Sequence, residues 1–469
     1  MSRFLKIILL AVGGFVALNV LIAAALYLLV DTNAYRSRFE ETASEISNME
    51  VSVDGRLRVG FFPGVNATLG GVRIRDRDVV VASAKEARFE IALLPLLRKE
   101  VRIRSIALKH SMISVERDRE GNFNFGKPDA AGTASPALNV EKVSLSDATF
   151  FYSDKQSGQE YEAANCDLFL RGKAPYSRKN LSFAGALACG EIRIDEFAAS
   201  NLKVDAEGKN GIIDFKPVTM RIFGAQGSGS IKADFSGAEP LYHLRYSLPQ
   251  FRIGEFIKRL SPQQVVEGTM DFSTDLSMRG KTVNEIKRSM KGQGTLQGDN
   301  LTLVGRDLDE ELNRYESSQN FNLVDVGAFF FAGPVGMALT RGYNFASLFQ
   351  GVGGSTEIRE LVSDWKVERG MAQAQDAAMA TDENRIALQG RLDFVNERFD
   401  DLVVAVIDAR GCAKVTQTMH GAFREPVVEN PSILKTLTGP VSEVFMKAKD
   451  LVTDGECEVF YDGSVSAPQ

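Results

Sequence analysis

The sequence predicts a mainly β protein that begins with one transmembrane helix. Residues 7–30 form an apolar run of about 24 residues, interrupted by Asn19, which is long enough to span the hydrocarbon core of a bilayer. Beyond this run, apolar and polar residues alternate with a period of two, and turn-forming pairs such as Asp54-Gly55 and Ser236-Gly237 separate the alternating segments. This combination predicts antiparallel strands joined by short hairpins, each with one apolar and one polar face.

A retained signal anchor explains residues 7–30 better than a cleaved signal peptide does. The apolar region of a signal peptide is about 7 to 15 residues long, whereas the alanines that could mark a cleavage site, at 23–25, lie inside this longer run. Arg3 and Lys6 precede the run, so we expect the N-terminus to stay in the cytoplasm and the body to be translocated. In a bacterium this arrangement is a single-pass inner-membrane protein with a periplasmic C-terminal body.

Composition limits the classes of function. The 469 residues carry 55 Lys plus Arg against 61 Asp plus Glu, a net charge of −6, which is no basic surface for nucleic acid. The three histidines have no metal-ligand spacing, and the sequence contains no nucleophile elbow, Walker loop or Rossmann glycine fingerprint. We therefore expect no catalytic residue, no cofactor and no metal site, and a function that is not enzymatic.

All four cysteines, Cys166, Cys189, Cys412 and Cys457, lie beyond the predicted anchor. An even number of cysteines in an oxidising compartment suggests two disulfides. Order along the chain favours Cys166 with Cys189 and Cys412 with Cys457, and the polar turn at 173–180 would suit a bridge between two neighbouring strands. Four buried free thiols are the alternative.

Helices are expected in few places. Residues 92–97 suggest an apolar turn or short helix, and residues 254–260 and 283–290 suggest short surface helices. Two regions should be more helical, 306–349 and 430–453, the second because Asn430 and Pro431 form a helix start signal.

Within the first helical region, the apolar stretch at 323–339 is too short to span a membrane comfortably. It contains Phe329, Phe330 and Phe331. One interpretation is a buried helical plug packed on the sheet. The other is a gate at the end of a groove, or a contact that dips into the membrane.

Domain boundaries follow composition. Residues 127–136 are rich in small residues and have a proline near each end, which predicts a flexible linker. A softer boundary falls near Gly292. The expected parts are the anchor (1–30), an N-terminal β domain (31–130), a middle β segment (131–290) and a C-terminal β domain with helices (291–469).

The order of these segments resembles the AsmA family. After the anchor come the glycine-containing hairpin at 55–64, the apolar element at 92–97, the strand region at 101–115 and the turn at 121–125. The C-terminal part is similar as well, over the following segments: 294–303, 306–312 and 385–394. The resemblance covers the chain outside 138–290, where the β pattern continues without a distinctive motif.

The resemblance implies an inner-membrane anchored periplasmic protein whose elongated, curved antiparallel sheet forms an open, taco-like groove. Larger relatives are thought to carry phospholipids toward the outer membrane, and others are linked to outer-membrane protein assembly. We therefore expect this chain to bind phospholipids and help to move them along the groove, supporting outer-membrane biogenesis and lipid homeostasis. The alternative is a non-enzymatic periplasmic scaffold that modulates outer-membrane protein assembly. Expected partners are membrane phospholipid, the inner membrane through the anchor and an envelope protein at the distal end, but no nucleic acid.

Physical chemistry favours a groove independently of the resemblance. Strands with one apolar face must bury it against a second layer, against one another or against a ligand, and long helices that could cover so much sheet are scarce. Acyl chains on the inner face would remove this surface from water, whereas a filled sandwich or closed barrel is the alternative. The candidates for the groove face are Leu57, Val59, Phe61, Phe272, Leu276, Leu388, Leu392 and Phe394.

Overall fold

The computed structural model describes twelve continuous stretches and parts of 36–45. The stretches are 49–60, 65–76, 79–92, 103–124, 140–156, 158–172, 182–194, 197–260, 265–312, 323–331, 353–433 and 457–468. The chain forms two compact units: unit 1, Met1–Gly211, and unit 2, Ile212–Gln469. The division between them falls inside the predicted middle segment, 131–290.

The predicted anchor, residues 7–30, lies outside the described residues. Among the residues that the structure does describe, no helix is both long enough and apolar enough to cross a membrane.

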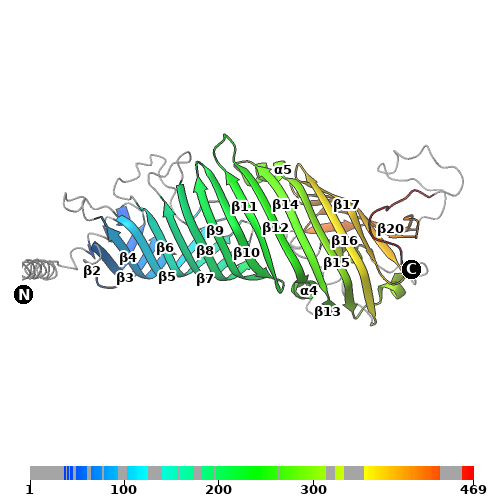
Figure 1. Ribbon diagram of the computed structural model, residues 1–469, viewed down its shortest axis with the longest axis horizontal. Helices are drawn as coiled ribbons and strands as arrows, with labels where there is room; N and C mark the ends of the chain where they lie inside the picture. The colour runs from blue at the N-terminus through cyan, green and yellow to red at the C-terminus, as the bar shows by residue number, and fades with distance from the viewer. Residues whose placement is uncertain are drawn as a thin grey trace, which may run out of the picture. The chain divides into compact units, whose positions relative to one another are not determined.

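Unit 1 is a β-sheet in which β3 to β9 lie side by side in chain order, with β1 and β2 both paired to β3 (Figure 1). Its strands are β1 (Glu50–Val53), β2 (Arg58–Gly60), β3 (Val65–Asp76), β4 (Val79–Ile91), β5 (Ile103–Arg117), β6 (Lys142–Asp154), β7 (Gln159–Gly172), β8 (Ser182–Ile194) and β9 (Phe197–Lys209). Neighbours are antiparallel except β5 and β6, which are parallel. The chain must therefore cross from the end of β5 to the start of β6. The predicted linker, 127–136, falls in this crossing and outside the described residues.

A line of left-handed residues crosses unit 1. His110 in β5, Asp147 in β6, Asn165 in β7 and Asn201 in β9 have φ angles of 48°, 51°, 52° and 53°. Gly190 of β8 lies between these strands, opposite Asn165. Asn, Asp and His adopt this conformation more readily than other non-glycine residues. Such irregularities bend strands and increase their twist, so the line curves the sheet.

The same line keeps the apolar side chains on one face. In β9, the inward positions are Phe197 and Ala199 before Asn201, but Leu202 and Val204 after it. A strict alternation would place one of these two pairs on the polar face. The left-handed residue resets the alternation, and one face of the sheet stays apolar on both sides of the line.

Unit 2 is also mainly β and, in the described strands, antiparallel. The strands lie side by side in the order β10, β11, β12, β14, β15, β16, β17, β18, β19, β20. The short strand β13 pairs with β15 on the same edge of β15 as β14 does. The short strands β21 and β22 pair with β20. Its strands are β10 (Ile212–Ile222), β11 (Ala225–Asp234), β12 (Leu241–Arg252), β13 (Val265–Glu267), β14 (Thr269–Arg279), β15 (Lys291–Val304), β16 (Ser355–Glu368), β17 (Met371–Ala380), β18 (Arg385–Asp393), β19 (Arg398–Ile407), β20 (Ala413–Ala422), β21 (Glu425–Val428) and β22 (Ser432–Ile433).

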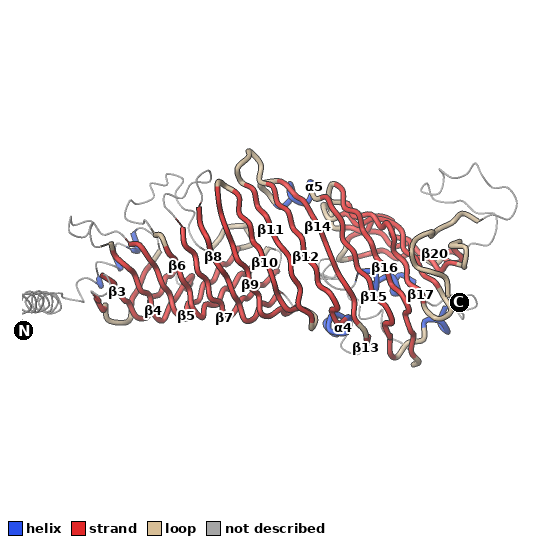
Figure 2. Tube along the Cα trace, viewed as in Figure 1, coloured by secondary structure: helices blue, strands red, loops and turns tan. Residues whose placement is uncertain are grey.

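The described helices of unit 2 are short. The two predicted surface helices are confirmed as α4 (Ile253–Leu260) and α5 (Val283–Ser289), which lie at opposite ends of the strands (Figure 2). A capping box between Thr282 and Glu285 begins α5. Within the predicted helical region 306–349, the structure has α7 (Leu323–Gly327) and the 3-10 helix η1 (Ala328–Phe331).

The helix predicted to start at Asn430 is wrong at its beginning. Ser432 and Ile433 form β22 and pair with Thr416 and Val415 of β20. A free edge of β20 can accept backbone hydrogen bonds from this segment, and this pairing overrides the local helix signal. The remainder of the predicted helical region, 434–453, lies outside the described residues.

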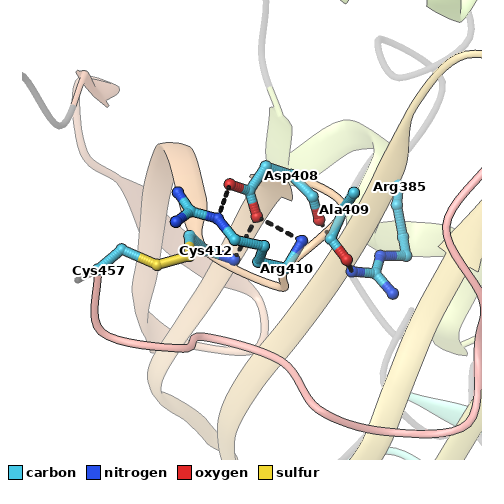
Figure 3. The surroundings of a disulfide bond; sticks show 6 residues. All are labelled: Arg385, Asp408, Ala409, Arg410, Cys412 and Cys457. Carbon is cyan, nitrogen blue, oxygen red and sulfur yellow. Dashed lines mark hydrogen bonds and ion pairs between the residues drawn. A yellow bond between two sulfur atoms is a disulfide. The ribbon is translucent and has the colours of Figure 1, made fainter. Parts of the chain in front are cut away.

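Both predicted cysteine pairs are bonded: Cys166 to Cys189 and Cys412 to Cys457. Figure 3 shows the second disulfide beside the turn between β19 and β20, where Asp408 accepts hydrogen bonds from the backbone N–H groups of Arg410 and Cys412, each at 2.9 Å. This disulfide attaches residues 457–468, the tail segment, to the turn between β19 and β20.

Candidate functional site

The apolar face of unit 1 carries three rows of side chains that run across the strands. The rows follow from the strand register, because directly paired residues lie on the same face of a sheet. Across β5 to β9 in order, the first row is Leu108, Leu145, Leu168, Leu187 and Val204, the second is Ile113, Phe150, Ala163, Ile192 and Ala199, and the third is Val115, Tyr152, Tyr161, Ile194 and Phe197.

Most of these side chains are neither buried nor fully exposed. Leu145 and Ala199 are buried, and the rest of the three rows is half-buried. Within the described part of unit 1, the closely contacting strands are sheet neighbours, and no second layer packs on β5 to β9. An apolar cavity of about 250 Å³ lies over the second and third rows and is lined by Ile113, Phe150, Tyr161 and Ile192 among others.

The opposite face of unit 1 is polar and carries ion pairs between neighbouring strands. Lys109 of β5 pairs with Glu86 of β4 at 3.0 Å, and Arg193 of β8 pairs with Glu162 of β7 at 3.3 Å. Exposed ion pairs of this kind stabilise little, but they keep this face hydrated. The sheet is therefore two-sided, and its apolar side remains partly open.

The dimensions of the apolar face suit acyl chains. The first row continues through Ala87 of β4 to Leu69 of β3, but both are buried with 1% exposure, so its partly open part crosses the five strands β5 to β9. At about 4.8 Å between strands, four intervals span about 19 Å. An acyl chain spans one leaflet, about half of the bilayer hydrocarbon core of about 30 Å. The open part of the row is therefore long enough to hold one chain lengthwise.

The Cys166–Cys189 disulfide lies on this apolar face. Both residues are buried, they are directly paired in β7 and β8, and their Cα atoms are 4.0 Å apart. They form a small cluster with Leu145 and Ala148 of β6. The bridge therefore fixes the β7–β8 register next to the left-handed residue Asn165.

Unit 2 combines a partly open apolar row with a packed core. Phe215, Ile231, Leu244 and Leu276 are paired across β10, β11, β12 and β14, and all four are half-buried. Tyr246 lies two residues after Leu244 in β12, on the same face of the sheet. Its hydroxyl has no hydrogen-bond partner among the described residues, and burial raises the pKa of Tyr246 to about 12.

The predicted groove residues fall into different environments. Leu57 and Val59 are half-buried in and beside β2, and Phe61 lies outside the described residues. Leu276 belongs to the half-buried row of unit 2. The others are packed: Phe272, Leu388 and Leu392 retain 6%, 2% and 1% exposure, and the half-buried Phe394 places its ring 6.1 Å from that of Phe423.

The phenylalanine triplet is buried. Phe329, Phe330 and Phe331 lie in the plug segment, α7 and η1, which contacts β16, β19 and β20. The hydroxyl of Ser363 donates to the Phe330 carbonyl at 2.8 Å, and the backbone N–H of Val324 donates to Gln417 at 3.3 Å. These buried polar contacts favour the plug interpretation, because side chains with so little exposure are not available to a membrane.

The tail segment covers the other face of the sheet over β16 to β19. Phe460, Tyr461 and Val465 pack against small side chains of β17, β18 and β19, including Ala378 and Ala387. The guanidinium of Arg385 donates to the Val465 carbonyl at 2.9 Å. This part of unit 2 is a filled core, covered on both faces, and offers no open groove.

Sequence reasoning missed the three rows of unit 1, because the middle segment has no distinctive motif. A signal does exist in the sequence. Within a single strand, the apolar residues occupy every second position, and this alternation shifts by one residue at a His, Asp or Asn. In β5, for example, Leu108 before His110 has an even number and Ile113 after it has an odd one. This change marks an irregular strand whose apolar face is continuous.

These features define a class of protein: a mainly β, two-sided sheet protein with a partly open apolar face. A family model described as the AsmA family matches residues 1–189 and, in a second match, 177–376. The chain therefore belongs to the AsmA family. Membership is consistent with a role in the cell envelope and in lipid transport, and the family is generally not enzymatic.

No curated protein and no solved structure matches the chain. In the part of the chain that the structure describes, no group of three or more His, Cys, Asp or Glu side chains could hold a metal ion.

Proposed function

We propose that this protein binds phospholipids through their acyl chains on the apolar face of unit 1 and allows them to move along that face. One observation carries the proposal: three rows of half-buried apolar side chains cross neighbouring strands, and the described part of unit 1 supplies no layer to cover them. A soluble protein rarely leaves so much contiguous apolar surface without a ligand or partner.

The chemistry of the face explains both binding and movement. Burial of each methylene contributes about 0.8 kcal/mol, so an acyl chain gains several kcal/mol on the rows. The rows contain aliphatic and aromatic side chains, and the hydroxyls of Tyr152 and Tyr161 are their polar groups. Hydrophobic attraction is not directional. A bound chain can therefore shift along the face with little change in energy.

The setting of this function follows from the family and from the predicted anchor. Residues 7–30 would hold the body beside the inner membrane, with unit 1 closest in sequence to the bilayer. Phospholipid leaving that membrane could then reach the apolar face directly. We propose on this basis a periplasmic role in outer-membrane biogenesis and lipid homeostasis.

Site-specific photo-crosslinking in cells tests the proposal on the full-length chain. A benzophenone amino acid at Leu187 or Leu202, both on the apolar face, should yield phospholipid adducts that mass spectrometry detects. The matched controls are Ala186 and Lys203, each one residue away on the polar face. Equal adducts at all four positions, or none at Leu187 and Leu202, would refute the proposal.

The filled core of unit 2 favours a second candidate, a non-enzymatic scaffold that modulates outer-membrane protein assembly. Purification of the full-length chain from membranes, followed by lipid extraction, separates the two. Phospholipid in stoichiometric amounts supports binding on the apolar face, whereas protein crosslinks at the apolar positions without lipid support the scaffold.

A further inference from the structure

A cavity of about 1370 Å³ opens at one end of the strands β14, β15 and β16 in unit 2. Its lining includes Arg279 at the end of β14, Arg288 in the last turn of α5 and Lys291 at the start of β15. The β14–α5–β15 connection thus brings three cationic side chains to one rim of the sheet. Arg369, in the turn after β16, lines the same cavity.

The rim has a defined backbone. The N–H of Arg279 donates to the Ser289 hydroxyl at 2.8 Å, and the N–H of Gly370 donates to the Met290 carbonyl at 3.0 Å. These bonds join the end of β14, the end of α5 and the β16–β17 turn. The backbone segments that bear the cationic side chains are therefore hydrogen-bonded to one another or to their neighbours at this rim.

The cations and the acids at the rim are engaged differently. Among the described residues, Arg279, Arg288 and Lys291 form no ion pair, and all three side chains are exposed. Five acids line the cavity; Glu239 and Asp364 are two of them, and the other three are engaged by neighbouring groups. Asp275 pairs with Arg245 at 2.8 Å, Glu368 pairs with Lys366 at 2.9 Å, and Glu285 accepts hydrogen bonds from two backbone N–H groups at the start of α5.

Apolar residues of the inner face reach the same cavity. Met278, which is half-buried, and the edges of Trp365 and Val367, which each retain 7% exposure, contribute to the lining. Val367 pairs with Gly292, which in turn pairs with Leu276 of the half-buried row. A Cβ atom on Gly294 would have no neighbour closer than 3.9 Å, so the lining is open there. Apolar surface and unpaired cations thus meet at one rim.

We infer that this rim binds the headgroup phosphate of an anionic phospholipid, while its acyl chains lie on the inner face beside Leu276 and Met278, both half-buried residues of β14. The inference rests on the proposed function, and it adds the charge class of the lipid and the place of its headgroup. Guanidinium and ammonium groups bind phosphate by charge-assisted hydrogen bonds. A headgroup with a net negative charge is attracted to the cationic rim more strongly than a zwitterionic headgroup, which is neutral overall.

Trp365 makes a direct test possible, because it is the single tryptophan of the chain and lines the cavity. The full-length protein, in phosphatidylcholine nanodiscs, is titrated with dihexanoyl phosphatidylglycerol while tryptophan fluorescence is recorded. Dihexanoyl phosphatidylcholine is the zwitterionic arm, and glycerol 3-phosphate is the phosphate arm without acyl chains. We expect a saturable change with phosphatidylglycerol that salt weakens, and at least tenfold weaker binding in the other two arms.

Three variants and one control variant test the site further. Arg288→Gln and Lys291→Gln should each weaken phosphatidylglycerol binding about tenfold, the effect of losing one hydrogen bond to a charged group. Gly294→Leu should also weaken it, by filling the open space without changing charge. Lys232→Gln, an exposed lysine of β11 away from the cavity, should leave the affinity unchanged.

Unchanged affinity in both cation variants, or equal affinity for phosphatidylcholine, would overturn the rim site. Tighter binding of glycerol 3-phosphate than of phosphatidylglycerol would overturn it as a lipid site and assign a soluble phosphate ligand. These outcomes are separable from failure of the proposed function, because lipid adducts at Leu187 and Leu202 would persist if only the rim site were wrong.

Discussion

At the scale of single residues, unit 2 contains two carboxylates in direct opposition. Asp364 of β16 and Asp376 of β17 are paired across the strands. Asp376 accepts hydrogen bonds from the Tyr461 hydroxyl and from the Ser464 N–H, whereas one oxygen of Asp364 is buried without a partner among the described residues. Burial, and then the charge of Asp376, raise the pKa of Asp364.

Asp364→Asn should therefore stabilise the protein at pH 7. An acid whose pKa is raised by folding opposes folding fully above its folded pKa, and this cost falls to zero as the pH drops from the folded pKa to below the unfolded pKa. We expect a gain of about 0.5 kcal/mol, the size of a cross-strand charge effect. Urea unfolding at pH 7 and at pH 3 measures it. Glu267→Gln, an exposed control, should have no effect at either pH, and a gain that persists at pH 3 would contradict the electrostatic explanation.

Arg385 holds the tail segment through its side chain. It is buried, it donates to the carbonyls of Val465 and Asp408 at 2.9 and 2.8 Å, and it lies over the ring of Tyr461 at 5.6 Å. Arg385→Met leaves the Val465 carbonyl without this donor, while the Asp408 carbonyl keeps the N–H of Gly411 at 3.0 Å. With the lost packing on Tyr461, we expect a loss of about 2 kcal/mol. Limited proteolysis should cut the tail segment faster. The control, Arg391→Met, removes an exposed ion pair with Asp400, and equal cleavage in both variants would contradict the role of Arg385.

At the scale of elements, alternation predicted most strands but not their faces. The segments at 242–248, 270–278 and 386–394 all lie in or at the end of β12, β14 and β18. However, β16 to β19 are covered by the plug segment on one face and the tail segment on the other. The near-continuous apolar run at 403–407 is typical of a strand buried on both sides. This is why Leu388 and Leu392 belong to a core.

The plug segment should act as core and not as a membrane contact. Phe330→Ala removes a side chain with 1% exposure and should cost about 3 to 5 kcal/mol in unit 2. Phospholipid adducts at Leu187 of unit 1 should be unaffected. Phe123→Ala, at an exposed phenylalanine, should cost much less. A Phe330→Ala protein with unchanged stability and reduced membrane binding would contradict this assignment.

The two disulfides should stabilise the protein to different extents. Cys412–Cys457 closes a segment with a sequence separation of 45, and Cys166–Cys189 one of 23. The loop-entropy model then gives about 4 and about 3 kcal/mol. Urea unfolding of the Cys412→Ala/Cys457→Ala and Cys166→Ala/Cys189→Ala double variants measures both. The order of the two losses is the test, and a larger loss for Cys166–Cys189 would show that its position on the apolar face outweighs chain entropy.

At the scale of the whole molecule, the sequence predicted the class and the family correctly. The mainly β body, the scarcity of long helices and the resemblance to the AsmA family all hold in the described residues and in the family match. The candidate site was predicted less well. Leu276 lies in a half-buried row and Leu57 and Val59 are half-buried, but the rows of β5 to β9 were not anticipated.

The sequence by itself determined that strands would form with one apolar and one polar face, because alternation with period two is a local property of the chain. It also indicated the pairing of the four cysteines through their order, and it contains a long apolar run at the N-terminus. Alternation and the apolar run are local properties of the chain, and the cysteine pairing followed from order along it.

Only the tertiary structure decided which apolar faces are covered. Coverage depends on where distant segments pack: the plug at 323–331 and the tail at 457–468 bury the faces of β16 to β19, while no described element does so for β5 to β9. An alternating strand has the same local pattern in both cases. The free energy that separates a packed core from an open apolar face arises from contacts between segments far apart in the chain. The alternation of apolar and polar residues does not predict these contacts.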